Sequence, residues 1–354
     1  MRRDRPLHAG AWLIWAGAVL VLLTATRNPW YVGLCLLWIA VTLHVVRTSG
    51  FALETAGPLL SPLRFGLLVV PVAALLNAAF VHVGETRLFE LPAGWPLLGG
   101  PITLEALVYG ALNGLVLTGF FAAFAVVNLV TPVRDLIQLT PRAFYPVAVT
   151  LAIAVTYVPM TLRQAELIRE AQAVRGHRLR GLRSWLPLFL PLLSSGLERA
   201  LMLAEAMVAR GFAAEQSAGR SPARRVLIQG LLLFGLFLLG GGWLLRLVWQ
   251  SPIVGAGLMA VGFVAFFVAL WQAGQSHRHT VYRPLPWRRQ EWIVSALASL
   301  AALIFLLPLP GLDRSTLAYY PYPALSLPGF ALLLGVATWG LLAPAAPYWG
   351  GSRA

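Results

Sequence analysis

Long apolar runs separated by short polar segments dominate this chain of 354 residues. A helix needs about 20 consecutive apolar residues to cross the hydrocarbon core of a membrane. Runs of that kind lie near residues 11–26, 30–46, 63–83, 104–130, 226–249, 252–273, 291–310 and 326–343. The pattern therefore predicts an all-α, polytopic membrane protein with about eight spans. Gly110 and Gly114 in the fourth run predict close packing of that helix against a neighbour.

The pattern changes between residues 131 and 225. Thirteen of the 27 arginines lie in this segment, and its apolar residues recur at helical spacing. One helix face carries Leu197, Leu201, Ala204 and Val208, which is typical of an amphipathic helix that lies against a surface. We therefore expect cytoplasmic amphipathic helices in this segment and not spans.

One stretch of the same segment, residues 143–160, is apolar enough to enter the bilayer. A single crossing there would place the arginine-rich helices on the opposite side of the membrane. We therefore predict that this stretch does not cross. We also expect Pro146 and Pro159 to break it, because proline lacks the N–H that an inner helical turn needs.

Composition narrows the function classes. Hydrophobic residues make up 58% of the chain and charged residues 11%, against about 25% charged residues in soluble domains, which excludes a soluble protein. All 27 basic residues are arginine, so the chain has neither the lysine of a P-loop nor a Schiff-base lysine. Any ATP hydrolysis must belong to another chain, and we expect neither a cofactor nor a metal ion in this one.

The distribution of the arginines predicts the orientation. If the N-terminus is cytoplasmic, 23 arginines fall inside, and the four that fall outside are Arg27, Arg87, Arg246 and Arg314. Such an excess of cytoplasmic cations is the usual mark of orientation in a membrane. The net charge of +14 is therefore explained without nucleic acid as a partner. We predict a multi-pass protein of the cell membrane with both termini cytoplasmic.

A short motif occurs twice within residues 131–225. Glu170-Ala-Gln-Ala-Val-Arg-Gly176 recurs at an offset of 35 residues as Glu205-Ala-Met-Val-Ala-Arg-Gly211. In each copy we expect a helix with Arg in its last turn, where a cation complements the helix dipole. The Gly that follows is expected to end the helix in the left-handed conformation. Two interpretations fit this pattern: ordinary helix ends, or paired contacts to two related partner surfaces.

The segment with both copies resembles the transmembrane T component of energy-coupling factor (ECF) transporters. The stretches that carry the resemblance are Tyr157-Val-Pro-Met-Thr-Leu-Arg163, Ala-Gln-Ala-Val-Arg-Gly176, Leu-Pro-Leu-Phe-Leu-Pro-Leu-Leu193 and Ala-Met-Val-Ala-Arg-Gly-Phe212. The family signature is a pair of Ala-Arg-Gly motifs at the ends of two cytoplasmic coupling helices. The second motif is intact, whereas the first has Val174 in place of Ala. The resemblance covers roughly residues 1–250.

By this resemblance, the chain is a non-catalytic coupling subunit of an ECF-type ABC importer in the lipid bilayer. It would join a substrate-binding S component to two ABC-type ATPase subunits, which bind the ATP, for uptake of a vitamin or a transition-metal ion. The resemblance implies that the ATPases are contacted by Val174, Arg175, Gly176, Ala209, Arg210 and Gly211. The helix face with Leu197, Leu201, Ala204 and Val208 would form a sliding surface.

The same resemblance divides the chain into four segments. Residues 1–130 form an N-terminal transmembrane bundle, and residues 131–225 form the cytoplasmic coupling region. Residues 226–250 add a transmembrane helix that completes the T-component-like region. Residues 251–354 are additional C-terminal transmembrane helices, to which the resemblance gives no role.

Two other functions stay open. A secondary transporter driven by an ion gradient usually needs an ionisable residue deep in the membrane, and only Glu105 and Glu291 touch the apolar runs, both at an end. A membrane-embedded enzyme needs a nucleophile or a cluster of His, Asp or Glu that faces a cavity, and no such cluster is visible in the sequence. ABC ATPases encoded in neighbouring reading frames would favour the coupling subunit over both.

Overall fold

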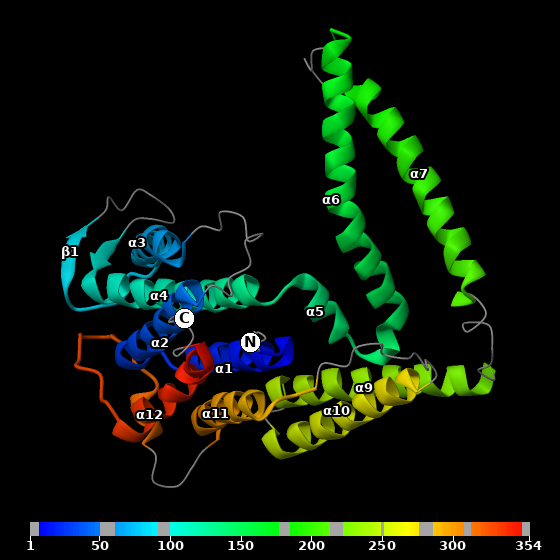
Figure 1. Ribbon diagram of the computed structural model, residues 1–354. Coiled ribbons are helices and arrows are strands. Elements are labelled where there is room, and N and C mark those ends of the chain that lie inside the picture. The colour runs from blue at the N-terminus through cyan, green and yellow to red at the C-terminus, as the bar shows by residue number, and fades with distance from the viewer. Residues whose placement is uncertain are drawn as a thin grey trace. The chain divides into compact units, whose positions relative to one another are not determined.

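The computed structural model describes residues 7–49, 61–90, 100–176, 185–212, 222–248, 251–275, 286–307 and 313–348. Helices account for most of these residues (Figure 1). Eight of the helices in these ranges are long and apolar enough to cross a membrane, which confirms the prediction of an all-α, polytopic membrane protein. The chain forms two compact units: residues 1–136 together with 284–354, and residues 137–283.

The first unit contains six α-helices among its described residues. They are α1 (Ala9–Ala25), α2 (Pro29–Thr48), α3 (Pro62–Phe80), α4 (Leu104–Val130), α11 (Arg289–Leu306) and α12 (Leu332–Ala337). Side chains of Asn28, Ser61 and Thr103 accept hydrogen bonds from backbone N–H groups in the first turns of α2, α3 and α4. These are preferred N-cap residues, and a proline at the first helical position of α2 and of α3 needs no N–H partner. Local sequence therefore determines where these helices begin.

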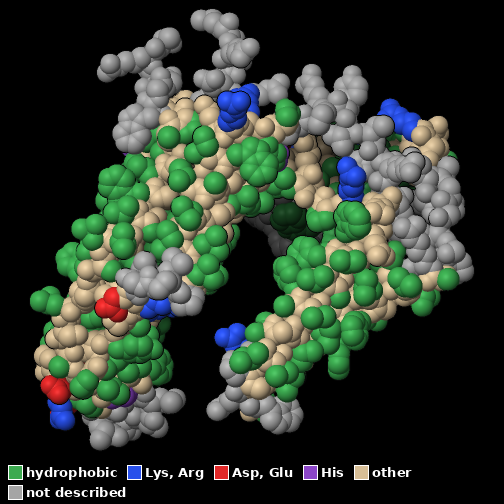
Figure 2. Space-filling model, turned by 90° about the horizontal axis from the view of Figure 1, so that it is seen from below, with side chains coloured by type: hydrophobic (Ala, Val, Ile, Leu, Met, Phe, Trp, Pro, Cys, Tyr) green, Lys and Arg blue, Asp and Glu red, His purple; other side chains and the backbone are tan. Residues whose placement is uncertain are grey.

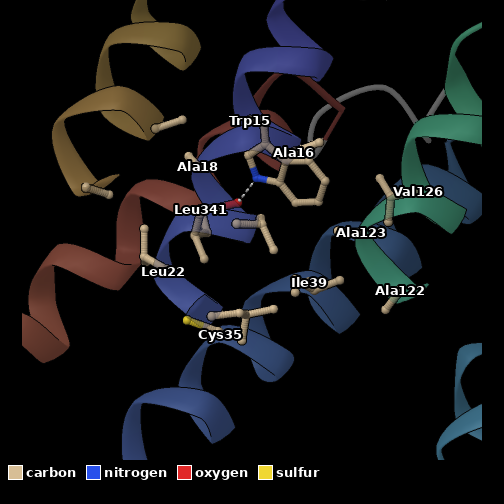
Figure 3. Close-up of a cluster of buried hydrophobic side chains, with 14 of the residues drawn as sticks. Trp15, Ala16, Ala18, Leu22, Cys35, Ile39, Ala122, Ala123, Val126 and Leu341 are labelled. Atoms are coloured by element: carbon tan, nitrogen blue, oxygen red, sulfur yellow. Dashed lines mark hydrogen bonds between the residues drawn. The ribbon is translucent and has the colours of Figure 1, made fainter. Parts of the chain in front are cut away.

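The core of this unit lies where α1 meets α2, α4, α11 and the 3₁₀ helix η4 (Thr338–Tyr348). Figure 3 shows this cluster, with Trp15 and Leu22 from α1 and Cys35 and Ile39 from α2. These four side chains are fully buried. Because α11 and η4 contribute to the same cluster, residues 284–354 are an integral part of the unit.

Helices α3 and α4 approach each other closely at two glycines. A methyl group placed on Gly110 would lie 2.6 Å from the carbonyl oxygen of Ala73, and one on Gly114 would lie 2.8 Å from Cα of Val70. Neither position leaves room for a side chain, which confirms the packing predicted for the fourth apolar run. Asn77 adds a hydrogen bond between the helices, from its Nδ2 to the carbonyl oxygen of Ala106 at 2.6 Å.

Contacts sort the helix ends of this unit into two groups. On one side, the backbone N–H of Leu7 donates to the hydroxyl of Tyr348 at 3.1 Å. On the other side, Nδ2 of Asn28 donates to the carbonyl oxygen of Thr316 at 2.7 Å. The arginine distribution predicts the same grouping, with the termini on one side of the membrane and residues 28 and 316 on the other. Which side is cytoplasmic stays a prediction.

The last predicted span differs from the structure. The predicted helix covers residues 326–343, whereas α12 begins at Leu332 and continues from Thr338 as the 3₁₀ helix η4. Pro344 and Pro347 lie inside η4 and lack the N–H that an α-helix would use. A 3₁₀ helix rises about 2.0 Å per residue, so α12 and η4 together rise about 31 Å, close to the thickness of a bilayer core.

The polar loop after α3 also contains structure that the sequence pattern does not predict. Strands β1 (Arg87–Glu90) and β2 (Pro101–Thr103) pair antiparallel. The hydroxyl of Thr103 also donates to the carbonyl oxygen of Val83 at 2.9 Å. The two strands thus form a short antiparallel pair, and β2 leads directly into α4.

The described residues of the second unit include two helix pairs. Its elements are the 3₁₀ helix η1 (Arg142–Phe144), α6 (Tyr145–Val174), α7 (Leu186–Ala209), α9 (Pro222–Val248) and α10 (Pro252–Gly274), and α5 (Val133–Gln138) spans the junction between the units. Helices α9 and α10 pack closely, because a methyl group on Gly242 would lie 2.8 Å from the carbonyl oxygen of Gly255. Helices α6 and α7 form the other pair.

The prediction that Pro146 and Pro159 break the first helix of the coupling region is wrong. Helix α6 runs without interruption from Tyr145 to Val174, with Pro146 in its first turn and Pro159 inside it. A proline in the first turn removes no helical hydrogen bond. Pro159 removes one, and the turns on both sides continue the helix.

Much of the surface is apolar. Figure 2 shows hydrophobic side chains over most of the described surface in view, with charged side chains at scattered positions. On α3, Leu63 and Leu67 are 78% and 76% exposed. Large exposed apolar patches mark contact with a membrane or with another subunit, in agreement with a multi-pass membrane protein.

Candidate functional site

The repeated motif lies on the hairpin of α6 and α7, which Figure 1 shows converging at one end and separating toward the other. Helix α6 has no buried residue, and Leu188 is the one buried residue of α7. Both helices are long and apolar enough to cross a membrane, so length and composition alone do not separate them from the spans. Their exposure in the isolated chain leaves both helices open to partners.

The first copy of the motif forms the end of α6. Val174 is the last helical residue, and Arg175 is the C-cap. The backbone N–H of Gly176 donates to the carbonyl oxygen of Ala173 at 2.9 Å, and Gly176 has a φ of +78°. Val174 is 90% exposed. The motif therefore projects freely from the helix end.

The second copy repeats this geometry at the end of α7. Arg210 is the C-cap, and the N–H of Gly211 donates to the carbonyl oxygen of Val208 at 2.9 Å. Gly211 has a φ of +77°. The prediction of a left-handed glycine at both helix ends is confirmed. Each arginine lies one position later than predicted, at the C-cap and not in the last turn.

Neither motif arginine has a hydrogen bond or ion pair to another side chain within the described ranges of the chain. Arg199 on α7 differs, because its Nη2 donates to the side-chain hydroxyl of Ser195 at 3.4 Å. Arg175 and Arg210 are both exposed. A guanidinium carries five N–H donors in a planar fork, so each motif offers unused donors to a partner.

The two motifs lie at opposite ends of the hairpin. The ring of Phe212, next to Gly211, contacts the ring of Tyr145, the first residue of α6, with centroids 6.3 Å apart. Arg175 lies at the other end of α6, which has 30 residues. At 1.5 Å per residue, the motifs are therefore about 45 Å apart.

The predicted apolar face of α7 is exposed along its whole length. Leu197, Leu201 and Val208 are 62%, 57% and 63% exposed, and Ala204 between them is also exposed. The structure thus places these four side chains on an accessible helix surface. Their role as a sliding surface stays a prediction, as do the contacts of both motifs with ATPases.

The two acidic residues at span ends lie in the first turns of α4 and α11 and are buried. The carboxylate of Glu291 accepts hydrogen bonds from the backbone N–H groups of His8 at 2.9 Å and Arg288 at 2.7 Å. Glu105 accepts one from the N–H of Thr86 at 3.1 Å. Glu291 therefore acts as a structural cap that joins α1 to α11. Within the described residues, no group of three or more His, Cys, Asp or Glu could hold a metal ion.

The contact between Tyr145 and Phe212 could not be predicted from the sequence. The residues are far apart in the chain, and neither belongs to the repeated motif. The one available signal is that an aromatic residue directly follows the second motif. Only the antiparallel arrangement of α6 and α7 brings the two rings together.

Comparisons with known proteins match the part of the chain that carries both motifs. Residues 4–219, more than half of the chain, match the cobalt transport protein family, CbiQ. The energy-coupling factor transporter transmembrane protein EcfT 1 of Listeria monocytogenes is 28% identical over 211 residues, which cover 54% of this chain and 73% of the relative. EcfT of Bacillus selenitireducens is 25% identical over 226 residues, which cover 58% of this chain and 78% of the relative.

Proposed function

This chain belongs to the CbiQ family of membrane components of ECF transporters, and we propose that it couples two cytoplasmic ATPase subunits to a substrate-binding membrane subunit. The ATPases hydrolyse ATP, and this chain transmits their movement through α6 and α7. The transported substrate is a vitamin or a transition-metal ion, bound by the third subunit. The chain itself carries no catalytic group in this proposal.

The observation that carries the proposal is the pair of matching helix ends at opposite ends of one hairpin. Both have Arg at the C-cap and a left-handed Gly after it. A globular domain of about 250 residues has a radius of gyration of about 18 Å and a diameter of about 45 Å. Two such domains side by side would present equivalent surfaces at about the spacing of the motifs. Matching geometry at this distance supports one ATPase for each motif.

The chemistry of each helix end supports docking in a polar groove. The guanidinium can form paired hydrogen bonds to a carboxylate, and it stays charged at every relevant pH. Val174 and Ala209 precede the arginines, and these small apolar residues leave space for a partner surface. Each motif can therefore enter a narrow acidic or carbonyl-lined groove.

The composition of the purified complex tests this proposal. The tagged chain, extracted from its source membranes, is expected to retain two ATPase chains and one smaller membrane chain per copy in intact-complex mass spectrometry. A chain that purifies without ATPases, and whose transport continues when ATP is depleted, would instead indicate a secondary transporter.

A further inference from the structure

The second motif is connected to the α9–α10 pair through a short series of contacts that passes through η1. Phe212 follows Gly211, and its ring lies against that of Tyr145 with the ring planes at 37°. Tyr145 begins α6 and directly follows η1. A displacement of Arg210 would therefore reach η1 through only two side chains.

The next contact joins η1 to the end of α10. A methyl group on Gly274 would lie 3.1 Å from Cβ of Arg142 and 3.3 Å from the backbone nitrogen of Ala143. Such a short approach leaves little freedom for η1 to move independently of α10. Helix α10 packs against α9 at Gly242 and Gly255. The contacts thus run from the second motif to the helix pair.

The first motif has a longer route to the same helix pair. Arg175 is separated from η1 by the whole of α6, about 45 Å of helix. A displacement of Arg175 would have to act through the length of this helix, which has no buried residue. The two motifs are therefore alike locally but differ in how they connect to the rest of the unit.

We propose that Tyr145 and Phe212 form a mechanical link that transmits movement of the second motif to the α9–α10 pair. The proposal rests on the proposed function, since an ATPase must act on Arg210. Tyr145 and Phe212 are positioning residues, because they act through the backbone and neighbouring helices. The two docking sites are then functionally unequal. The ATPase at Arg210 acts on α9 and α10 through this short link, and the ATPase at Arg175 acts only along the length of α6.

A fluorescent reporter on the α9–α10 pair tests this link. Ser251, at the start of α10, is replaced by Cys and labelled with an environment-sensitive maleimide in the complex purified with its ATPases. The native thiol of Cys35 is buried. ATP is expected to change the fluorescence. Phe212→Ala and Tyr145→Ala should each reduce this change by about two- to tenfold, the range expected for losing one aromatic pair, with co-purified ATPase unchanged.

Ring-retaining and distant variants serve as controls. Phe212→Tyr and Tyr145→Phe should show the same ATP-dependent fluorescence change as the parent. The double Ala variant should lose no more of this change than either single variant, because each single variant already removes the same contact. Phe189→Ala removes an exposed ring from α7, 62% exposed, and should have no effect.

Two outcomes would overturn the link. One is a parental ATP response in Phe212→Ala and Tyr145→Ala, and the other is a double variant whose losses add. If the proposed function is wrong, a different result is expected: the Arg210→Ala variant would still co-purify with its ATPases. If Arg210→Ala loses the ATPases while Phe212→Ala responds like the parent, only the link is rejected.

Discussion

The indole Nε1 of Trp15 donates a hydrogen bond of 2.8 Å to the carbonyl oxygen of Leu341, 326 residues further along the chain (Figure 3). In a 3₁₀ helix this carbonyl would accept the N–H of the third following residue. That residue is Pro344, which has no N–H. Trp15 therefore supplies the donor that η4 lacks, and the C-terminal segment depends on α1 for its backbone hydrogen bonding.

Replacing Trp15 by Phe is expected to destabilise the protein by about 1–3 kcal/mol, because the buried carbonyl of Leu341 loses its donor. Adding Pro344→Ala should recover part of this loss, since residue 344 then has an N–H. Thermal unfolding of the purified protein in detergent measures both effects. Equal stability of Trp15→Phe and the parent, or no recovery in the double variant, would show that the hydrogen bond contributes nothing.

The arginine distribution predicts which residues are accessible from outside the cell. Ser315→Cys should react with a membrane-impermeant maleimide on intact cells, and Gln275→Cys should react only after the membrane is opened. Cys35 is buried, so labelling of the parent protein measures the background reaction with the maleimide. Labelling of Gln275→Cys from outside would reverse the orientation and place α6 and α7 away from any cytoplasmic ATPase.

Replacing the left-handed glycine of either motif by Ala is expected to strain the backbone without causing a steric clash. A methyl group on Gly176 or on Gly211 would meet no atom within 4 Å, so an Ala there costs only the strain of a positive φ, about 1–2 kcal/mol. We expect Gly176→Ala and Gly211→Ala to loosen the helix end and reduce the recovery of ATPases with the tagged chain.

Gly196 in the middle of α7 is the matched control for these substitutions. It also has open space around it but no positive φ. Gly196→Ala should leave ATPase recovery unchanged and raise the stability of α7 by up to about 1 kcal/mol. A loss of ATPases in this variant equal to that in Gly211→Ala would mean that any added methyl group blocks docking.

Local features were predictable from the sequence. Hydrophobic run lengths predict the all-α membrane fold, and Gly110 and Gly114 predict close packing of α4. Arg followed by Gly predicts the two helix ends, because capping depends on residues within one turn. The similarity of the two ends, with φ values of +78° and +77°, follows from the repeat.

Contacts between distant segments could not be predicted in this way. Trp15 and Leu341 meet only because α1 and η4 pack together, and Tyr145 and Phe212 meet only because α6 and α7 are antiparallel. No local pattern encodes such a pair. Pro159 shows the converse, because its helix-breaking tendency is outweighed by the helical turns on both sides of it.

Recovery of ATPases with Arg175→Ala, Arg210→Ala and the double variant tests the central claim most directly. Loss of a charged, hydrogen-bonded contact in a buried interface costs about 2–5 kcal/mol, so each single variant should bind its ATPase at least tenfold more weakly. The double variant should lose both ATPases, and Arg169→Ala, an exposed arginine of α6 outside the motif, should retain both. If Arg175→Ala and Arg210→Ala recover ATPases like the parent at matched expression, the paired motif is helix capping alone.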